Sequence, residues 1–425
     1  MAPSRPWSRR EFGRTAVGTA AALLVPQFVP RHVLGAADQP GAHARVTVGV
    51  IGVGGRCGLL IDQLPAQGRI VAAADCFVTR AEQAAAKRQV KWRIHQDYRR
   101  LLDEKDIDAV IVGTHDHGRV LPCIHACQAG KDVYAEKPLT VYIAEGRALV
   151  NAVRRHQRVF QVGTQQRSME MNRVACEFVR DGGVGKVHTV LGINYPGPNR
   201  YRGLSEEPVP EGLNWDAWLG PTEWRPYNRQ LHFGWMGWRD YSGGEMTNWG
   251  AHGLDQIQWA LGMDDTGPVE FWPLTPGANG AVAYRYANGI AVRLELTRGP
   301  HGGAIFVGDQ GKIEINRNKF TSNPPDMIKN LPRREDIDKW RDEVALWQAR
   351  FHLENWLACI QTRQRPVADV EIGHRSVSVC HLANITRELG RKLRWNPQQE
   401  QFVDDDEANA YVSRPRRKGY ELPPL

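Results

Sequence analysis

The sequence predicts an α/β protein of two domains, the first built on a parallel sheet and the second on a large, mostly antiparallel open sheet. Two observations predict this division. Over residues 45–163, short apolar runs alternate with helical patterns, as in a parallel sheet with crossover helices. From about Asn172, strand patterns follow one another and are joined by hairpin signals such as Asn288-Gly289 and Asp309-Gln310-Gly311.

Composition limits what the protein can be. The 425 residues suffice for two cores, and no apolar run reaches the length of about 18 residues that a membrane helix needs. Half of the formal net charge of +8 lies in the first 36 residues, so the rest gives no reason to infer nucleic-acid binding. The seven cysteines include no C-x-x-C pair, which predicts core thiols and neither a disulfide framework nor a metal site.

The N-terminus resembles a twin-arginine export signal, which carries folded proteins across a bacterial inner membrane. Ser8-Arg9-Arg10-Glu11-Phe12 precedes a mildly apolar run over residues 15–29. We therefore expect residues 1–36 to be a signal peptide and the mature protein to be periplasmic. An uncleaved anchor or a basic start without function is the alternative, and the sequence does not fix the cleavage site.

The first predicted strand, residues 45–51, runs into a glycine turn and a helix that continues to Gln63. Glycines at 52 and 54 allow a tight turn and let the backbone approach a pyrophosphate at the helix N-terminus. The third position of this fingerprint is Cys57, which is small enough for close helix packing. The pattern predicts a dinucleotide-binding Rossmann domain, for which we expect the bounds 44–166.

The next predicted strand, residues 70–74, ends at Asp75, about 20 residues after the glycines. A carboxylate there accepts hydrogen bonds from the adenosine ribose and repels a 2′-phosphate. The position of Asp75 therefore favours NAD over NADP.

Lys137 follows a further predicted strand, residues 132–135, in the run Tyr134-Ala135-Glu136-Lys137-Pro138-Leu139. That places it at the carboxyl edge of the sheet, where open α/β folds bind ligands, and Pro138 restricts its backbone to extended conformations. Thr114-His115-Asp116-His117 ends the preceding strand of the array, and we expect it to face the nicotinamide. Taken alone, each run could equally be a solvated turn.

Together these motifs, with Gly163-Thr164-Gln165-Gln166-Arg167, resemble the glucose-fructose oxidoreductase, inositol dehydrogenase and rhizopine-catabolism family (Gfo/Idh/MocA) over residues 44–395. The resemblance implies oxidation or reduction at a carbon of a sugar or polyol. It also implies a cis peptide bond before Pro138. The expected cofactor-binding residues are Gly52, Gly54, Gly55, Arg56, Asp75, Thr114, His117, Glu136, Lys137 and Gln165.

The second domain is predicted over residues 167–395, with a helix at 172–181 and strands at 187–195, 268–274, 281–287, 290–297, 303–308 and 311–316. Helices are expected at 342–362 and 372–392, the latter packing back on the first domain, with an extended tail over 396–425. Because family members often cover the open sheet face with a second subunit, we expect a homo-oligomer, a dimer or a tetramer.

Residues 195–259 hold seven of the fourteen tryptophans. Aromatic faces stack on sugar rings, but tryptophan is also a common core residue. The candidates for holding substrate hydroxyls or rings are Arg167, Tyr195, Trp238, Arg239 and Asp255.

The run from Gly243 to Asp255 begins a helix that we expect to continue through Trp259, with Asn248, His252 and Asp255 on one face. It resembles the family signature G-G-x-x-x-D-x-G-x-H-x-x-D, so the catalytic histidine falls on His252 and the catalytic aspartate on Asn248. Asparagine brings no charge, so His252 should be a weaker proton store, and Lys137 should take more of the acid-base work.

The predicted function is an NAD-dependent oxidoreductase in which Lys137 and His252 exchange protons with a sugar, glycoside or polyol and Asn248 orients His252. Because the cell envelope is not expected to hold free nicotinamide cofactor, an exported enzyme should regenerate a tightly bound one in place. The alternatives are a redox-neutral lyase, glycosidase or epimerase working through a transient keto-sugar, and a noncatalytic sugar-binding protein.

Overall fold

The structure, a computed structural model, describes residues 45–332 and 348–424. The predicted signal peptide, residues 1–36, lies outside the described residues. Among the residues that are described, no helix combines the length and the apolar character of a membrane span.

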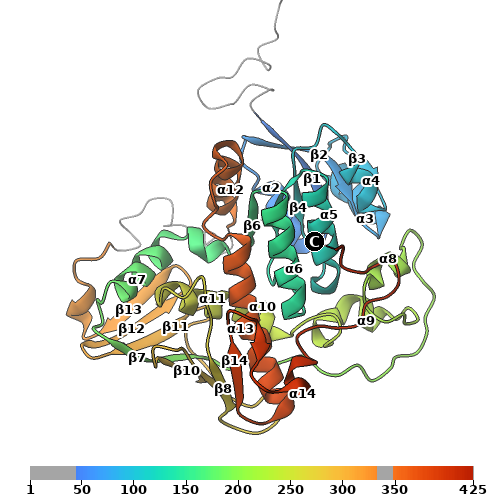
Figure 1. The fold of residues 1–425 in the computed structure, drawn as a ribbon. Coiled ribbons are helices and arrows are strands. Elements are labelled where there is room, and N and C mark those ends of the chain that lie inside the picture. Colours follow the sequence, from blue (N-terminus) through green and yellow to red (C-terminus); the bar gives the residue numbers. More distant parts are fainter. Residues whose placement is uncertain (1–44, 333–347, 425) are drawn as a thin grey trace, which may run out of the picture. The chain divides into compact units, whose positions relative to one another are not determined.

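The first sheet has six parallel strands in the order β3-β2-β1-β4-β5-β6 (Figure 1). The strands are β1 (Val46–Ile51), β2 (Gly68–Ala74), β3 (Arg93–His95), β4 (Ala109–Val112), β5 (Asp132–Ala135) and β6 (Phe160–Val162). Their inner members are almost entirely buried, as expected of a sheet covered on both faces. This confirms the predicted parallel domain.

The register brings several loops to one edge of this sheet. Ile51 pairs with Ala74 and with Val112, and Val112 pairs with Ala135. The residues that follow these strands therefore start side by side. The carboxyl edge is where the predicted motifs meet.

Helices cover both faces of the first sheet. The core on one face includes residues of α4 (Tyr98–Leu102), α5 (Val120–Gln128), α6 (Ile143–Arg155) and α13 (Val370–Leu389). The core on the other includes residues of α2 (Gly55–Asp62), α3 (Val78–Lys87) and α12 (Arg350–Thr362). The return of α13 to the first domain was predicted, whereas that of α12, where buried Trp356 packs against Tyr134, was not.

The second sheet has nine strands in the order β13-β12-β11-β7-β10-β9-β8-β14-β15. Only β7 and β10 pair in parallel, so the sheet is mostly antiparallel, as predicted. The predicted strands are β7 (Val187–Ile193), β8 (Glu270–Pro273), β9 (Val282–Arg285), β10 (Ala291–Leu296), β11 (Ala304–Gly308) and β12 (Gly311–Asn316). The sequence did not predict β13 (Lys319–Asn323), β14 (Leu393–Asn396) or β15 (Gln401–Phe402).

Helices α7 (Glu170–Arg180), α11 (Gly250–Ala260) and α13 pack on one face of the second sheet. The alternation of side chains along the strands puts Val190, Leu294 and Phe306 in this core. It turns Leu191, Ile305 and Val307 to the opposite face, where they are partly exposed.

An insert between β7 and α11 has a small aromatic core of its own, formed by Trp215, Trp218, Tyr227, Leu231 and Tyr241 with neighbouring residues. It contains α8 (Trp215–Leu219), α9 (Arg229–Gly234) and α10 (Glu245–Asn248). The single helix predicted to run through Trp259 is therefore wrong. The chain instead forms α10 and α11 on either side of Trp249.

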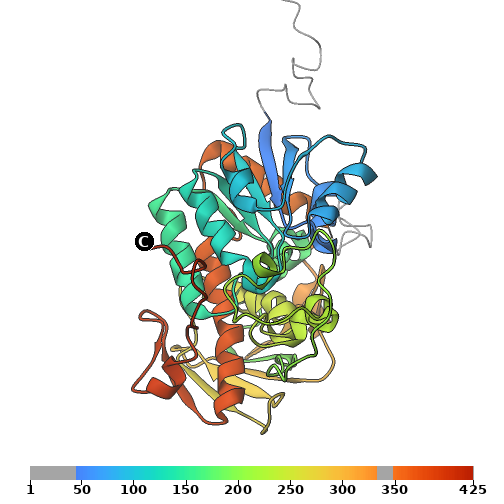
Figure 2. The same cartoon turned by 90° about the vertical axis from the view of Figure 1, so that its right-hand side faces the viewer.

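The C-terminal tail is not extended throughout, which corrects that expectation. After β15 it forms the short helix α14 (Asp406–Asn409), because the Asn409 side chain hydrogen bonds both backbone polar groups of Phe402 and Asp405 caps the helix. The last residues then run to the helices of the first domain (Figures 1 and 2).

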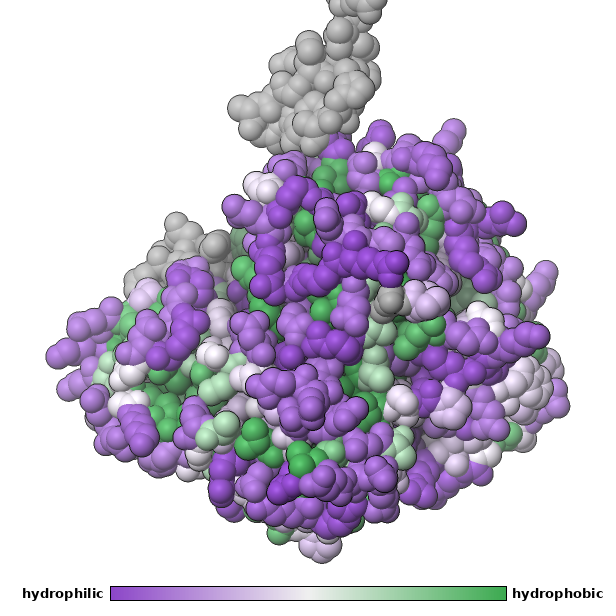
Figure 3. Space-filling view, in the orientation of Figure 1, coloured by the Kyte–Doolittle hydropathy of each residue, from purple (hydrophilic) through white to green (hydrophobic). Residues whose placement is uncertain are grey.

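The face shown in Figure 3 is mainly hydrophilic, with smaller apolar patches between the charged side chains. All seven cysteines are free, and six of them are buried, in agreement with the prediction of core thiols.

Candidate functional site

A cavity of about 1350 Å³ lies between the carboxyl edge of the first sheet and loops of the second domain. All ten predicted cofactor-binding residues line it, as do the three predicted catalytic residues, Lys137, Asn248 and His252. It exceeds the range of about 300–1,000 Å³ that is usual for a small-molecule site, so it has room for a dinucleotide and a further ligand.

The glycine turn after β1 fits a pyrophosphate. Gly52 has φ +82°, and a Cβ there would lie 2.8 Å from the backbone nitrogen of Thr114, so this position requires glycine. Gly54 is the N-cap of α2, and a Cβ on Gly54 or Gly55 would meet no atom within 4 Å. The open space beside the helix N-terminus is a cradle that a phosphate group could fill.

Cys57 takes the third glycine position of the fingerprint, and its neighbour explains why this is tolerated. A Cβ at Gly113 would lie 2.8 Å from the Cys57 Cβ and 2.9 Å from its Sγ. Gly113, which directly follows β4, therefore leaves the space that lets α2 pack closely on the sheet.

Asp75 is fixed at the edge of the cavity by backbone donors. Its two carboxylate oxygens accept hydrogen bonds from the Val53 nitrogen at 2.7 Å and the Phe77 nitrogen at 2.8 Å. Burial raises the pKa of Asp75, and the backbone hydrogen bonds oppose that rise. Each carboxylate oxygen keeps a lone pair that a ribose hydroxyl could use.

Glu136 ties the glycine turn to the lysine loop. Its carboxylate binds Arg56 Nε at 2.9 Å, and it also accepts a hydrogen bond from the Lys137 backbone nitrogen at 3.1 Å. The peptide bond between Lys137 and Pro138 is cis, as the resemblance implied.

The Lys137 side chain is partly buried, and its ammonium group binds neutral partners. Its Nζ donates to the Asn248 side-chain oxygen at 2.7 Å and to the Asn248 carbonyl at 3.0 Å. Burial lowers the pKa of Lys137 to about 8, although Glu136 and Asp116 act in the opposite direction. A lysine with such a pKa is partly neutral near pH 7 and is suited to general base catalysis.

Asn248 acts on Lys137 in this structure. Besides accepting from Lys137, its side-chain nitrogen donates to Glu245 at 3.1 Å. Among the described residues it makes no hydrogen bond with His252, so the expected role of Asn248 in orienting His252 is not supported. Both polar atoms of the Asn248 side chain are bonded elsewhere, the oxygen to Lys137 and the nitrogen to Glu245, which explains this.

His252 lies in the first turn of α11 and is 4% exposed. Burial, and then the positive charges of Arg317, Lys137 and Arg56, lower its pKa well below the usual value. Its Nδ1 is buried without a hydrogen-bond partner within the described part of the chain. A neutral imidazole here agrees with the prediction of a weak proton store.

Arg317, which the sequence did not single out, also lines the cavity. It follows β12, donates through Nε to Gln166 at 3.1 Å and lies over the Trp249 ring at 5.0 Å. Burial lowers its pKa to about 10. An arginine in a turn between strands gives no local signal of this placement.

The loop after β4 is held by Arg119, which bonds the carbonyls of Thr114 and Pro138 and pairs with Asp116 at 3.3 Å. Beside it, the rings of His115 and His117 stack at 4.0 Å, and His117 Nε2 lies 2.8 Å from the Trp218 carbonyl. The aromatic insert is thereby bound to the cofactor edge.

The five substrate-binding candidates lie outside the residues that line the cavity. Arg167 and Asp255 bind each other at 2.9 Å, and Arg167 also binds Asp264 at 2.7 Å. The Tyr195 hydroxyl accepts from the Gly302 nitrogen at 3.0 Å.

Of the other two candidates, Trp238 packs on Tyr201 and Arg239 pairs with Glu388 at 3.0 Å beside a separate small cavity. All five side chains thus contact other parts of the protein, and their substrate contacts stay predictions that this geometry does not support. The cavity wall is formed instead by residues that the sequence did not select, including Trp218, Phe233, Trp235, Met236, Arg416 and Tyr420.

Two family models match the chain. The model described as "Oxidoreductase family, NAD-binding Rossmann fold" (GFO_IDH_MocA) matches residues 46–164. The model described as "Oxidoreductase family, C-terminal alpha/beta domain" (GFO_IDH_MocA_C2) matches residues 199–422.

Among curated proteins, the chain is 31% identical over 150 residues to the uncharacterized oxidoreductase YrbE of Bacillus subtilis (strain 168). That match covers 34% of this chain and 42% of the relative. Inositol 2-dehydrogenase of Salmonella typhimurium is 27% identical over 127 residues, covering 30% and 38%. The chain thus spans about two fifths of the length of these curated relatives.

Among solved structures, a levoglucosan dehydrogenase in complex with NADH and levoglucosan superposes with a TM-score of 0.60 at 17% identity. The superposition covers 82% of this chain and 99% of the other. At this identity the likeness shows the fold.

Proposed function

The chain belongs to the Gfo/Idh/MocA oxidoreductase family, and from this premise we propose that it is an NAD-dependent oxidoreductase acting at a carbon of a sugar, glycoside or polyol. One observation carries the proposal. A partly buried lysine with a pKa of about 8 shares a single cavity with a glycine cradle for a pyrophosphate and a carboxylate placed for a ribose. A proton acceptor and a dinucleotide site are thus side by side.

We assign a role in the proposed reaction to four residues of this cavity. When bound, NAD would supply the hydride acceptor or donor for a carbinol carbon. In the direction of oxidation, neutral Lys137 takes the hydroxyl proton, while the two oxygens of Asn248 fix the position of Nζ. His252 is neutral, and its unpartnered Nδ1 can exchange a proton with a substrate that binds next to it. Arg317 can donate a hydrogen bond to a substrate oxygen.

A redox-neutral reaction is the second candidate, and the bonding of Asn248 favours it. In that route the substrate is oxidised transiently, so that the proton on the adjacent carbon becomes acidic, a group is eliminated or a centre inverted, and the hydride returns. The route depends on a base such as Lys137 more than on a charged imidazolium, and here Asn248 binds the lysine while His252 is neutral.

The first test is mass spectrometry of the purified protein after denaturation, followed by incubation of the dialysed protein with a panel of sugars, glycosides and polyols. We expect stoichiometric NAD, and turnover without added nucleotide. Accumulation of an oxidised and a reduced product indicates net redox transfer, whereas products of unchanged oxidation state indicate the redox-neutral route. Absence of any dinucleotide would instead favour a noncatalytic sugar-binding protein.

Export by the twin-arginine route is part of the proposal and rests on Arg9 and Arg10. Replacing both by lysine should leave the protein in the cytoplasm, as measured by cell fractionation against the unchanged chain. The protein would be loaded with NAD before export. It would then have to retain this cofactor, because the cell envelope is not expected to hold free nicotinamide cofactor.

We also propose a homo-oligomer formed through the open face of the nine-stranded sheet. Partly exposed Leu191, Ile305 and Val307 supply apolar surface there. Light scattering of the full chain should give a dimer or tetramer, and Ile305→Lys should shift it toward the monomer, whereas a monomeric parent protein would contradict this assembly.

A further inference from the structure

The end of the chain takes part in the cofactor cavity. Arg416, Gly419 and Tyr420 line the same cavity as Asp75. The lining also includes Gln96, Asp97 and Tyr98, which follow β3, and five residues of the insert, Asp216, Ala217, Trp218, Gly220 and Pro221. Gln96 Nε2 donates to the carbonyl of Cys76, next to Asp75, at 3.2 Å and to the Gly212 carbonyl of the insert at 3.0 Å. These segments therefore meet beside the carboxylate that is placed for the adenosine ribose, and we call this part the adenosine half of the cavity.

We call residues 414–421 the clasp. Its first half is bound to the first domain by a buried ion-pair cluster, in which Arg414 and Arg416 both pair with Glu145 of α6. The three side chains are 7%, 9% and 4% exposed. Arg414 also donates to the Asp240 carbonyl at 2.9 Å and the His117 carbonyl at 3.3 Å, so this end is firmly fixed.

The second half of the clasp is bound to the insert. Arg417 donates to the Gly220 carbonyl at 2.8 Å and 3.0 Å and pairs with Asp216, whose carboxylate also accepts from the Tyr420 hydroxyl at 2.9 Å. The Asp216 side chain is 60% exposed. Contacts to such an exposed carboxylate are weak, although Arg417 itself is 18% exposed and is also held by the Gly220 carbonyl. This half should therefore detach more readily than the buried half.

We propose that the clasp closes the adenosine half of the cavity over the bound dinucleotide and limits the rate at which it leaves. The inference rests on the proposed function, because it needs NAD to be the ligand. A segment that binds α6 on one side and the insert on the other crosses the mouth between them, and an adenosine leaving on this side must displace it. Detachment of Arg417 and Tyr420 from Asp216 is the opening step.

The test is the dissociation rate of NAD from preloaded full-length protein, followed by exchange into excess isotope-labelled NAD. In the double variant Arg417→Ala/Tyr420→Ala we expect this rate to rise about tenfold or more, because a clasp that is no longer bound to Asp216 opens more often and changes of this kind act mainly on dissociation. The single variant Arg417→Ala, whose residue does not line the cavity, should reduce prebound NAD by substrate in a single turnover at close to the parent rate, since Lys137 and its partners are untouched.

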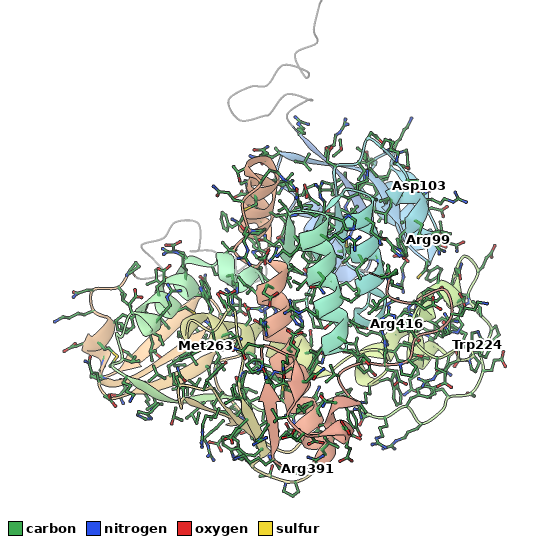
Figure 4. The ribbon with its side chains drawn as sticks, viewed as in Figure 1. Arg99, Asp103, Trp224, Met263, Arg391 and Arg416 are labelled. Atoms are coloured by element: carbon green, nitrogen blue, oxygen red, sulfur yellow. The ribbon has the colours of Figure 1, made fainter. Side chains whose placement is uncertain are left out.

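Arg391→Ala is the matched control. Arg391 belongs to the same end of the chain and makes comparable ion pairs with Asp405 and Glu407, but it does not line the cavity. Figure 4 shows it well separated from Arg416. Its loss should leave NAD dissociation at the parent rate.

Trypsin gives an independent readout, because Lys418 is exposed and followed by glycine. NAD should slow cleavage after Lys418 in the parent protein and protect the double variant less. If the parent protein binds no dinucleotide, both the proposed function and the clasp are wrong. If it binds NAD but the double variant releases it at the parent rate, or NAD does not change cleavage at Lys418, the clasp alone is wrong.

Discussion

Two cations that follow strands of the first sheet reach helices of the second domain, and they differ in what they contact there. Lys137 follows β5 and reaches Asn248 at the end of α10. Arg167 follows β6 and reaches Asp255 in α11. The first pair faces the cavity and the second does not.

The difference lies in charge compensation. Burial acts to lower the pKa of Arg167, but Asp255 and Asp264 more than offset it, so the pKa is raised and the guanidinium is permanently charged. The Lys137 ammonium group hydrogen bonds only to neutral oxygen atoms of Asn248, and burial lowers its pKa to about 8 against the opposing charges of Glu136 and Asp116. A buried cation with two carboxylates is a structural connection, whereas one with neutral partners can give up its proton.

The largest effect should come from removing the lysine. In Lys137→Ala we expect kcat to fall by about 10²–10⁴-fold, the usual contribution of a positioned base, while the melting temperature changes little. Lys137→Arg should be as slow, because arginine keeps the charge but does not release a proton at neutral pH. Rates are to be measured on protein with equal NAD content.

Lys392→Ala is a suitable control, because that lysine is exposed and pairs with Glu270 in the second sheet. Its turnover should match that of the parent protein. Unchanged turnover of Lys137→Ala would exclude Lys137 from the mechanism and would remove the contrast between the two cations.

The next effect should be on stability. Asp255→Asn leaves buried Arg167 with Asp264 alone and weakens the hydrogen bond from Ser376, so we expect the free energy of unfolding to fall by about 3 kcal/mol. Urea unfolding measures it. Glu295→Gln, in the half-exposed pair with Arg293, should cost less than about 1 kcal/mol. Equal losses in the two variants would contradict a structural role for Arg167 and Asp255.

The sequence predicted the residues at the cofactor edge because their geometry is local. Gly52 and Asp75 directly follow a strand and Lys137 lies two residues past one, and the pairing of parallel strands brings strand ends to one edge. A motif at a strand end therefore indicates both the chemical role of its residues and their location at the carboxyl edge of the sheet. Six of the nine strands of the second sheet, β7 to β12, were predicted for similar reasons, from alternation and hairpin turns within short stretches.

The substrate end could not be predicted in this way. Helical spacing places Asp255 on the same helix face as His252, but only the fold shows that the Asp255 side chain contacts Arg167 and does not line the cavity. Asn248 was assigned to the same face because nothing in the sequence indicated the break at Trp249. Arg317 and Tyr420 enter the cavity from a turn and from the chain end, through contacts between residues distant in sequence.

The smallest effect, and the one that tests the contrast most directly, is a change in the charge of the lysine's partner. In Asn248→Asp a carboxylate replaces the oxygen atom 2.7 Å from Nζ, so the pKa of Lys137 should rise from about 8 toward the ordinary value of 10.5. Because the base is the neutral amine, the rising limb of kcat/KM against pH should move upward by about one unit or more. At a fixed pH below 8 this is a loss of about tenfold.

The free energy of unfolding should also depend on pH through Lys137. In the parent protein the pKa of Lys137 is lower folded than unfolded, so the unfolded chain binds more protons between about pH 8 and 10.5 and stability rises with pH there. Asn248→Asp narrows that pH interval and should flatten the rise in stability.

Glu245→Gln added to Asn248→Asp removes the repulsion between the new carboxylate and Glu245 while the pKa of Lys137 stays high. If the pH limb stays at its parent position in both variants, another group titrates and Lys137 is not the base.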